Sequence, residues 1–199
     1  MDYPSSEPVI HVCVLAAGTS SRFGVTKLTQ TLNGLPLLQH ALIAATGACP
    51  ERVTLVVGHD QQAVVAASGD LADRTIINDD YRSGMGSSIA TAVRTCRKNA
   101  DAILILLADQ PLITAPHLNE LIERWSGRNT EIVASHFDGT LGPPILFPSG
   151  TYDALGALAG DKGAKSVLTS SDYDVTSVDI PEAGIDVDSP ETLRALDRS

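Results

Sequence analysis

The 199-residue sequence predicts an α/β fold in three layers, with helices on both faces of a mixed, mainly parallel sheet. Short apolar runs of strand length alternate with longer segments of helical pattern, which is the order typical of parallel sheets. One run, residues 102–108, is apolar throughout and does not alternate, so we expect a strand buried on both faces. Hydrophobic residues make up 43% of the chain and charged residues 19%, which is the balance of a folded protein.

The expected strands are short apolar stretches closed by turn-forming residues, and the expected helices begin at a cap or at a proline. The predicted strands are residues 9–15, 53–57, 75–78, 102–108, 132–135, 144–147 and 175–180, followed by an extended stretch at 186–188. The predicted helices are residues 36–45, 61–67, 87–98 and 114–125, two short ones within 151–170, and 190–196. Residues 1–8 are expected to form a flexible lead and residues 9–199 a single domain, since no repeat or linker interrupts the pattern.

The composition excludes several classes of partner. The formal net charge is −10, whereas nucleic acids and anionic membranes demand a basic face. No apolar run approaches the roughly 20 residues that span a bilayer, and the polar start does not resemble a secretory signal. Cys13, Cys49 and Cys96 lie in no metal-ligand spacing, so we expect buried free thiols and a cytoplasmic location.

A loop rich in small residues follows the first expected strand. Residues 15–18 read Leu-Ala-Ala-Gly, and small side chains let the backbone approach a ligand and present its N–H groups to phosphate oxygens. Arg22 and Lys27 add two positive charges to the same loop. The pattern is neither a P-loop nor G-x-G-x-x-G. The loop predicts a polyphosphate site, and the alternative is a surface loop with two solvated cations.

A second glycine-containing segment, residues 84–89, reads Gly-Met-Gly-Ser-Ser-Ile and opens an expected helix. Glycines before serine at a helix start expose N–H groups at the positive end of the helix dipole, which suits an anion or a base edge. An ordinary serine helix cap is the alternative.

Acidic residues stand at two further positions. Asp109 ends the apolar strand at 102–108, where an ionised carboxylate is costly unless a cation or a donor compensates it. This position suits a ligand of Mg²⁺ shared with phosphate, and a capping or hydrogen-bonded aspartate is the alternative. Asp186 and Asp188 share one face of an extended segment. Asp188 or Ser189 can instead cap the following helix, and capping by Ser189 is compatible with metal binding by Asp188.

Taken together, six motifs resemble one known family. They are LAAGTSSRFGVTK at 15–27, GMGSSI at 84–89, LADQP at 107–111, GPPILF at 142–147, GDKGAK at 160–165 and DVDSPE at 186–191. In this order they resemble the molybdenum cofactor nucleotidyltransferases, closest to the cytidylyltransferase branch. The resemblance covers nearly the whole chain.

The resemblance implies a Rossmann-like nucleotide-diphospho-sugar transferase fold and a reaction that moves CMP from CTP onto the phosphate of molybdopterin or molybdenum cofactor, with release of pyrophosphate. It implies catalytic roles for Arg22 and Lys27, nucleotide binding by Leu15, Ala16, Ala17, Gly18, Gly86 and Ser87, and binding of Mg²⁺ or Mn²⁺ by Asp109 and Asp188, with Asp186 as a further carboxylate. The guanylyl branch more often carries Leu-Ala-Gly-Gly, so CTP is favoured over GTP. The implied partners are the NTP, a pterin phosphate acceptor, and a molybdoenzyme or its chaperone.

The chain departs from the family pattern at three places. Phe23 replaces a methionine, Gly142-Pro143-Pro144 stands where Gly-His-Pro is common, and Lys165 replaces an arginine. The last two lie on the expected acceptor side. Two alternative functions stay open: a sugar-1-phosphate-type nucleotidyltransferase of the same fold, and a non-catalytic maturation factor that binds a nucleotide or cofactor.

Overall fold

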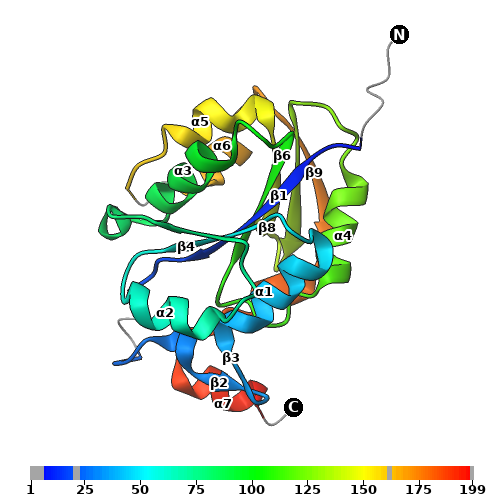
Figure 1. The fold of residues 1–199 in the computed structure, drawn as a ribbon. Coiled ribbons are helices and arrows are strands. Elements are labelled where there is room, and N and C mark those ends of the chain that lie inside the picture. The colour runs from blue at the N-terminus through cyan, green and yellow to red at the C-terminus, as the bar shows by residue number, and fades with distance from the viewer. Residues whose placement is uncertain (1–6, 20–22, 161–162, 198–199) are drawn as a thin grey trace.

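The computed structural model describes residues 7–19, 23–160 and 163–197. Its centre is a seven-stranded sheet in the order β5-β4-β1-β6-β8-β7-β9, drawn in Figure 1 with β1 and β4 running across the view. The strands are β1 (Ile10–Ala16), β4 (Val53–Val57), β5 (Arg74–Ile77), β6 (Ala102–Leu107), β7 (Glu131–Phe137), β8 (Thr140–Pro148) and β9 (Asp174–Asp179). The helices are α1 (Leu37–Ala48), α2 (Gln61–Ser68), α3 (Met85–Cys96), α4 (Ala115–Arg124), α5 (Tyr152–Gly156), α6 (Lys165–Leu168) and α7 (Pro190–Leu196).

The strand directions make the sheet mixed and mainly parallel. Strands β5, β4, β1 and β6 are parallel neighbours, and β7 is parallel to β9. Among the strands that the structure describes in this sheet, only β8 runs against its two neighbours, β6 and β7. Strand β6 lies between β1 and β8 and is buried along nearly its whole length, as its apolar run predicts. The predicted fold class is confirmed.

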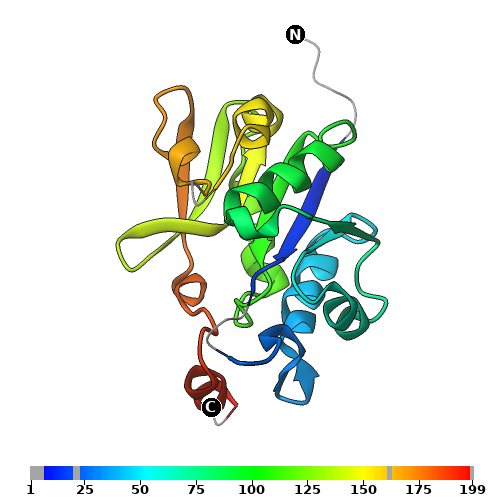
Figure 2. The same ribbon diagram turned by 90° about the vertical axis from the view of Figure 1, so that its left-hand side faces the viewer.

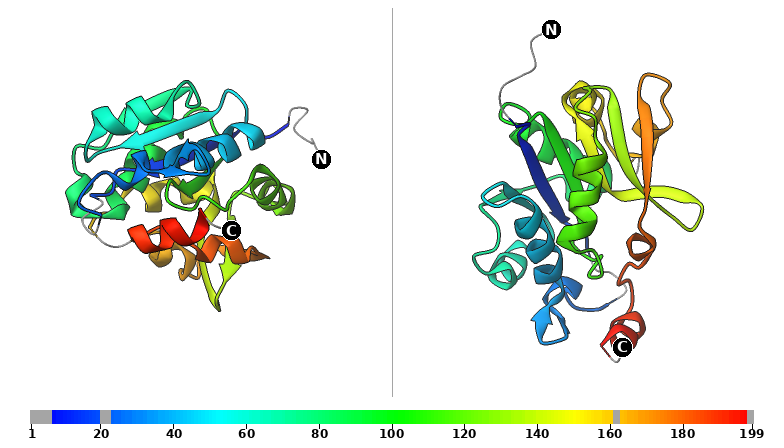
Figure 3. Two further views of the ribbon diagram at one scale, coloured as in Figure 1. Left: turned by 90° about the horizontal axis from the view of Figure 1, so that it is seen from below. Right: turned by 90° about the vertical axis from the view of Figure 1, so that its right-hand side faces the viewer.

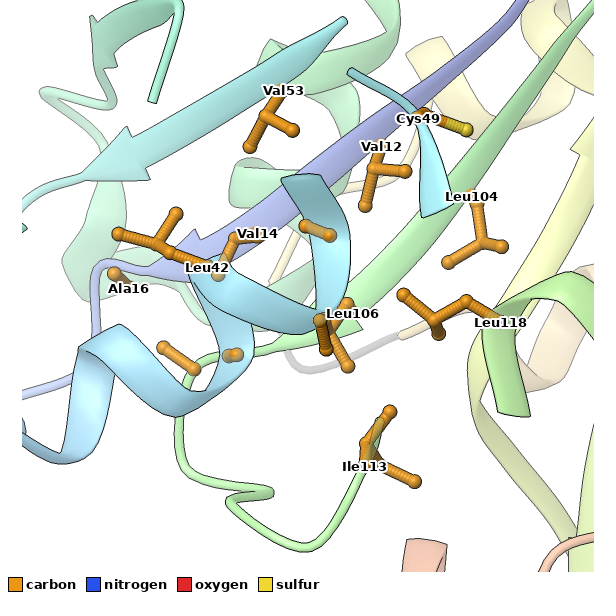
Figure 4. Close-up of a cluster of buried hydrophobic side chains, with 14 of the residues drawn as sticks. Val12, Val14, Ala16, Leu42, Cys49, Val53, Leu104, Leu106, Ile113 and Leu118 are labelled. Carbon is orange, nitrogen blue, oxygen red and sulfur yellow. The ribbon is translucent and has the colours of Figure 1, made fainter. Parts of the chain in front are cut away.

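Alternate side chains of the strands build two separate cores. In β1, Val12 and Val14 join the core beneath α1 and α4, whereas Cys13 and Leu15 join the core beneath α3, α5 and α6. This follows from the two-residue period of a strand. Figure 4 shows the first core, where Leu104 and Leu106 of β6 lie with Leu42 of α1 and Leu118 of α4. The two views of Figure 3 show the helices on both sides of the sheet.

Two side-chain expectations are met in the described part of the chain. Cys13, Cys49 and Cys96 are all buried and free, and the sulfur atoms of Cys13 and Cys96 lie 3.7 Å apart. Ser189 caps α7, because its hydroxyl accepts a hydrogen bond from the backbone N–H of Thr192 at 3.2 Å. No described helix is long and apolar enough to cross a membrane.

The structure differs from the predicted elements in several places. Residues 186–188 form no strand and are held instead by a 2.9 Å bond from the Val187 N–H to the Asp109 carbonyl. Helix α3 begins at Met85, two residues earlier than expected. Strand β8 begins at Thr140 and passes through two prolines, which the irregular pairing with β7 near Ser135 accommodates. A small hairpin of β2 (Thr31–Leu32) and β3 (Leu35–Pro36) was not predicted, and Figure 2 shows it near α7.

Candidate active site

The carboxyl ends of neighbouring parallel strands bring distant loops together. Leu15 of β1 is in register with Leu107 of β6, so Gly18 and Asp109 follow adjacent strand ends. Ligands of open α/β sheets bind at this edge. Two cavities lie here, of about 250 Å³ and about 360 Å³, and Leu15, Gly18, Thr19 and Asp109 line both of them.

The first cavity holds a lysine between two carboxylates. The Lys27 ammonium lies 2.7 Å from an Asp109 carboxylate oxygen and 3.0 Å from one of Asp188, and the Lys27 side chain is only 13% exposed. Lys27 begins the short 3-10 helix η1 (Lys27–Thr29), Asp109 follows β6, and Asp188 precedes α7. Segments separated by 82 and 161 residues therefore meet at one positive charge.

The electrostatics of this group keep the ammonium charged. Burial by itself lowers the pKa of Lys27, but the charges and hydrogen bonds of Asp109 and Asp188 outweigh burial and raise it. Lys27 is therefore a cation at every physiological pH. A fixed cation beside a loop of small residues is an arrangement that attracts phosphate oxygens.

A third carboxylate lies close to this pair. Burial of the Asp186 carboxyl group is the largest cause that raises its pKa, and the negative charges of Asp109 and Asp188 add to it. The pKa of Asp186 is thereby raised to about 6, although the charge of Lys27 opposes the shift. Within the described residues, however, no three His, Cys, Asp or Glu side chains group as ligands of one metal ion. Asp109 and Asp188 are the carboxylates that converge on one point. Two carboxylates fit Mg²⁺, which usually completes its shell with water and substrate phosphate.

An aromatic ring and an arginine line the second cavity. Gly58 packs so closely against Tyr81 and Ala17 that a Cβ on Gly58 would lie 2.6 Å from the Tyr81 Cβ and 2.9 Å from the Ala17 Cβ. The Arg82 guanidinium lies 5.4 Å from the centroid of the Tyr81 ring. Both residues belong to the 3-10 helix η2 (Tyr81–Ser83), which follows β5. This wall offers a flat surface and a positive charge.

The start of α3 forms the rest of that wall. Gly84 precedes the helix with a φ of 116°, a conformation that favours glycine. The buried Asn78 amide donates to the hydroxyl groups of Ser87 and Ser88 at 2.8 and 3.0 Å and holds the turn together. Gly86 and Ser87 are buried, and the residues of this segment that line the cavity are Gly84, Met85 and Ser88.

A third cavity of about 250 Å³ adjoins the second one. Met85 lines both. The remaining wall comes from α3, β6, β8 and the region of α6, and it includes Gly142, Pro143 and Lys165. At these positions the chain departs from the family pattern, and the sequence analysis expects them on the acceptor side. The cavity is mainly aliphatic, with Lys165 as the cation among the described residues that line it.

The structure brings together most of the residues that the sequence singled out. Leu15, Ala16, Ala17, Gly18, Lys27, Asp109 and Asp188 all line the first or second cavity. Arg22 lies outside the described residues, as do residues 161–162 of the GDKGAK motif. Tyr81 and Arg82 were missed because no glycine pattern marks them. Their place after a strand was the available signal.

Cavities at the strand ends of an open α/β sheet, with the Lys27 cation beside a loop of small residues, are the arrangement of a nucleotide-binding protein. Residues 12–175 match the family model described as the MobA-like NTP transferase domain, and the chain belongs to this family. It is therefore a nucleotidyltransferase of the NTP transferase superfamily.

Relatives of known name cover almost the whole chain. The chain is 32% identical over 197 residues to the purine catabolism protein PucB of Bacillus subtilis (strain 168), covering 93% of this chain and 94% of PucB. It is 30% identical over 200 residues to the nicotine blue oxidoreductase of Paenarthrobacter nicotinovorans, covering 95% of this chain and 97% of that protein. The crystal structure of Rv0371c from Mycobacterium tuberculosis H37Rv matches with a TM-score of 0.80 and 27% identity, over 97% of this chain and 100% of that one. Its complex with manganese matches with a TM-score of 0.77 and 26% identity, over 96% and 99%.

Proposed function

We propose that the protein transfers CMP from CTP to the phosphate of molybdopterin or molybdenum cofactor, with release of pyrophosphate and dependence on Mg²⁺ or Mn²⁺. The observation that carries a metal-dependent transfer is the Lys27 ammonium between Asp109 and Asp188, at strand ends beside the loop at 15–18. The six motifs of the sequence carry the choice of CTP and of the pterin acceptor.

In the proposed reaction, an oxygen of the acceptor phosphate attacks the α-phosphorus of the NTP, and the bond from that phosphorus to the pyrophosphate oxygen breaks. Backbone N–H groups of residues 15–18 would bind the triphosphate, and Lys27 together with Arg22 would neutralise the charge that builds on it. An already ionised acceptor phosphate needs no general base. This agrees with the two described cavities at the strand ends, which no described histidine lines.

Asp109 and Asp188 would hold the divalent cation. When bound, the ion supplies positive charge to the phosphate oxygens and the departing pyrophosphate. The manganese complex of Rv0371c, a structure 26% identical to this chain, supports a divalent metal. Lys27 would exchange its contact with the carboxylates for one with phosphate, which leaves both carboxylates available to the ion.

Tyr81, Arg82 and Gly84 would form the wall against which the nucleoside lies. The aliphatic cavity that adjoins it past Met85 would receive the acceptor, with Lys165 at its edge. An aliphatic lining can pack against the face of a flat heterocyclic ring. The choice of the pterin over a sugar-1-phosphate rests on the six sequence motifs.

The test is pyrophosphate release with Mg²⁺ from CTP, GTP, ATP and UTP, with and without molybdopterin or its metal-loaded form. We expect release from CTP that depends on the pterin. Release that depends on a sugar-1-phosphate would replace the acceptor, and nucleotide binding without release would favour the maturation factor. Because one relative is named an oxidoreductase, NADPH oxidation is measured in parallel. Oxidation without pyrophosphate release would overturn the proposal.

A further inference from the structure

We propose that Gln110 is a positioning residue, which holds the chain segment of Asp188 in place against the strand end of Asp109. The inference rests on the proposed function in one respect: Asp109 and Asp188 are taken as the carboxylates that bind the divalent ion. Gln110 follows Asp109 directly, and only 1% of its surface is exposed.

The Gln110 side-chain amide joins three parts of the chain. Its nitrogen donates to the Ala183 carbonyl at 2.7 Å and to the Pro143 carbonyl at 3.1 Å, across 73 and 33 residues of sequence. Ala183 belongs to the 3-10 helix η4 (Pro181–Gly184), just before the carboxylate segment, and Pro143 lies near the start of β8. One side chain therefore ties the strand end at Asp109 to the second carboxylate segment and to the expected acceptor side.

A backbone bond completes this attachment. The Val187 N–H donates to the Asp109 carbonyl at 2.9 Å. Consecutive residues 109 and 110 therefore hold residues 183 and 187, and Asp188 follows immediately. Because Val187 is fully buried, the segment that they hold has little freedom to move. The separation of the two carboxylates depends on these two attachments.

The nitrogen of the Gln110 side-chain amide makes the two attachments, whereas its oxygen makes none. This oxygen is buried and has no hydrogen-bond partner. A buried unpaired acceptor destabilises a fold, whereas an apolar side chain of similar volume would avoid that cost. We infer that glutamine is placed here for its two N–H donors, which bind the Ala183 and Pro143 carbonyls. The same amide also faces Asp186, whose pKa it lowers.

The test replaces Gln110 by methionine, which has a similar volume and no donor. The matched control is Gln39→Met, because the Gln39 amide also donates to a backbone carbonyl, that of Ala67 at 2.9 Å, between α1 and α2. Three quantities are measured: hydrogen exchange of residues 183–188, the affinity for Mn²⁺ by electron paramagnetic resonance without substrate, and the kcat and KM of pyrophosphate release.

For Gln110→Met we expect faster exchange in residues 183–188 and Mn²⁺ binding weakened by about 10–100-fold, the usual effect of losing a residue that orients metal ligands. The kcat should fall with the metal affinity, while the KM for the nucleotide stays within threefold of wild type. Gln39→Met should leave all three quantities unchanged.

Mn²⁺ affinity and exchange in Gln110→Met that match those of Gln39→Met would overturn the proposal. If Gln110→Met does not fold, Gln110→Leu serves instead, since it also lacks N–H donors and adds no buried charge. Failure of both variants to fold would show a purely structural role. Weakened Mn²⁺ binding in a protein that releases no pyrophosphate would refute the proposed function and leave this inference standing.

Discussion

Replacing Lys27 by alanine removes the cation around which the candidate site is arranged. The lost ammonium makes bonds of 2.7 and 3.0 Å to Asp109 and Asp188. In the proposed mechanism it stabilises charge on the phosphates, and removal of one preorganised donor of this kind costs about 2–4 kcal/mol of barrier. We therefore expect turnover to fall by about 30- to 1,000-fold, since each 1.36 kcal/mol is a factor of ten.

The effect on stability should be smaller than the effect on turnover. Asp188 is 57% exposed, so solvent screens its bond to Lys27, and an exposed pair of this kind is worth at most about 1 kcal/mol. The pKa of Lys27 is raised in the folded protein, so its stabilising contribution is complete below the ordinary lysine value of 10.5 and is lost as the pH rises above that value. Lys27→Ala should therefore be less stable than wild type at neutral pH, and the difference should vanish in strong alkali.

The assay is steady-state release of pyrophosphate at saturating Mg²⁺ and nucleotide, with melting curves for each variant. Lys98→Ala is the matched control, because Lys98 is an exposed lysine just beyond the far end of α3. Lys27→Arg keeps the charge and should retain part of the activity. Turnover of Lys27→Ala within threefold of wild type would remove Lys27 from the mechanism.

Three further variants test other parts of the site. Asp109→Asn should abolish activity or its dependence on the metal, and an unchanged Mg²⁺ titration would exclude Asp109 as a ligand. Asp186→Asn should raise the melting temperature at pH 7.5 in metal-free buffer but not at pH 4. The reason is that the pKa of Asp186 is about 6 in the folded protein against an ordinary value of 3.8, so the ionised carboxylate destabilises the fold at pH values above that range. An equal effect at both pH values would contradict this. Gly58→Ala should displace Tyr81, raise the KM for the nucleotide and destabilise the fold by about 1–3 kcal/mol. Gly156→Ala, with open space around its Cβ, is the control, and an equal KM in both variants would exclude Tyr81 from the nucleotide wall.

The sequence predicted those features that depend on local pattern. An unbroken apolar run before Asp109 marks a central strand, and polar residues after strands mark the site edge, so the positions of Gly18, Lys27 and Asp109 could be anticipated. The sequence pattern could not predict which charged side chains pair with one another in the folded protein. Asp188 lies 161 residues from Lys27, and only the folded sheet brings the two together.

Other features escaped prediction because tertiary contacts decide them. The hairpin of β2 and β3 is too short to show a period, and the Asn33 N–H at its turn is bonded to the Asp197 carboxylate at 2.7 Å. Strand β8 begins at Thr140, before the strand predicted at residues 144–147, and the adjacent prolines at 143 and 144, which normally argue against a strand, gave no signal of this extension. Gln110 gave no signal beyond its place after Asp109, because its importance comes from two distant carbonyl groups.

The reversed direction of β8 has a consequence for how the molecule can vary. Strands β1 and β6 end at the edge where the cavities lie, whereas β8 begins there, after a turn at Asp138 and Gly139 that joins it to β7. A longer or shorter hairpin would therefore reshape the edge near Gly142 without moving the loops that follow β1 and β6. The sheet thus divides into a half whose strand ends carry Gly18 and Asp109 and a half whose hairpin length can change, which is a physical basis for one scaffold serving different ligands.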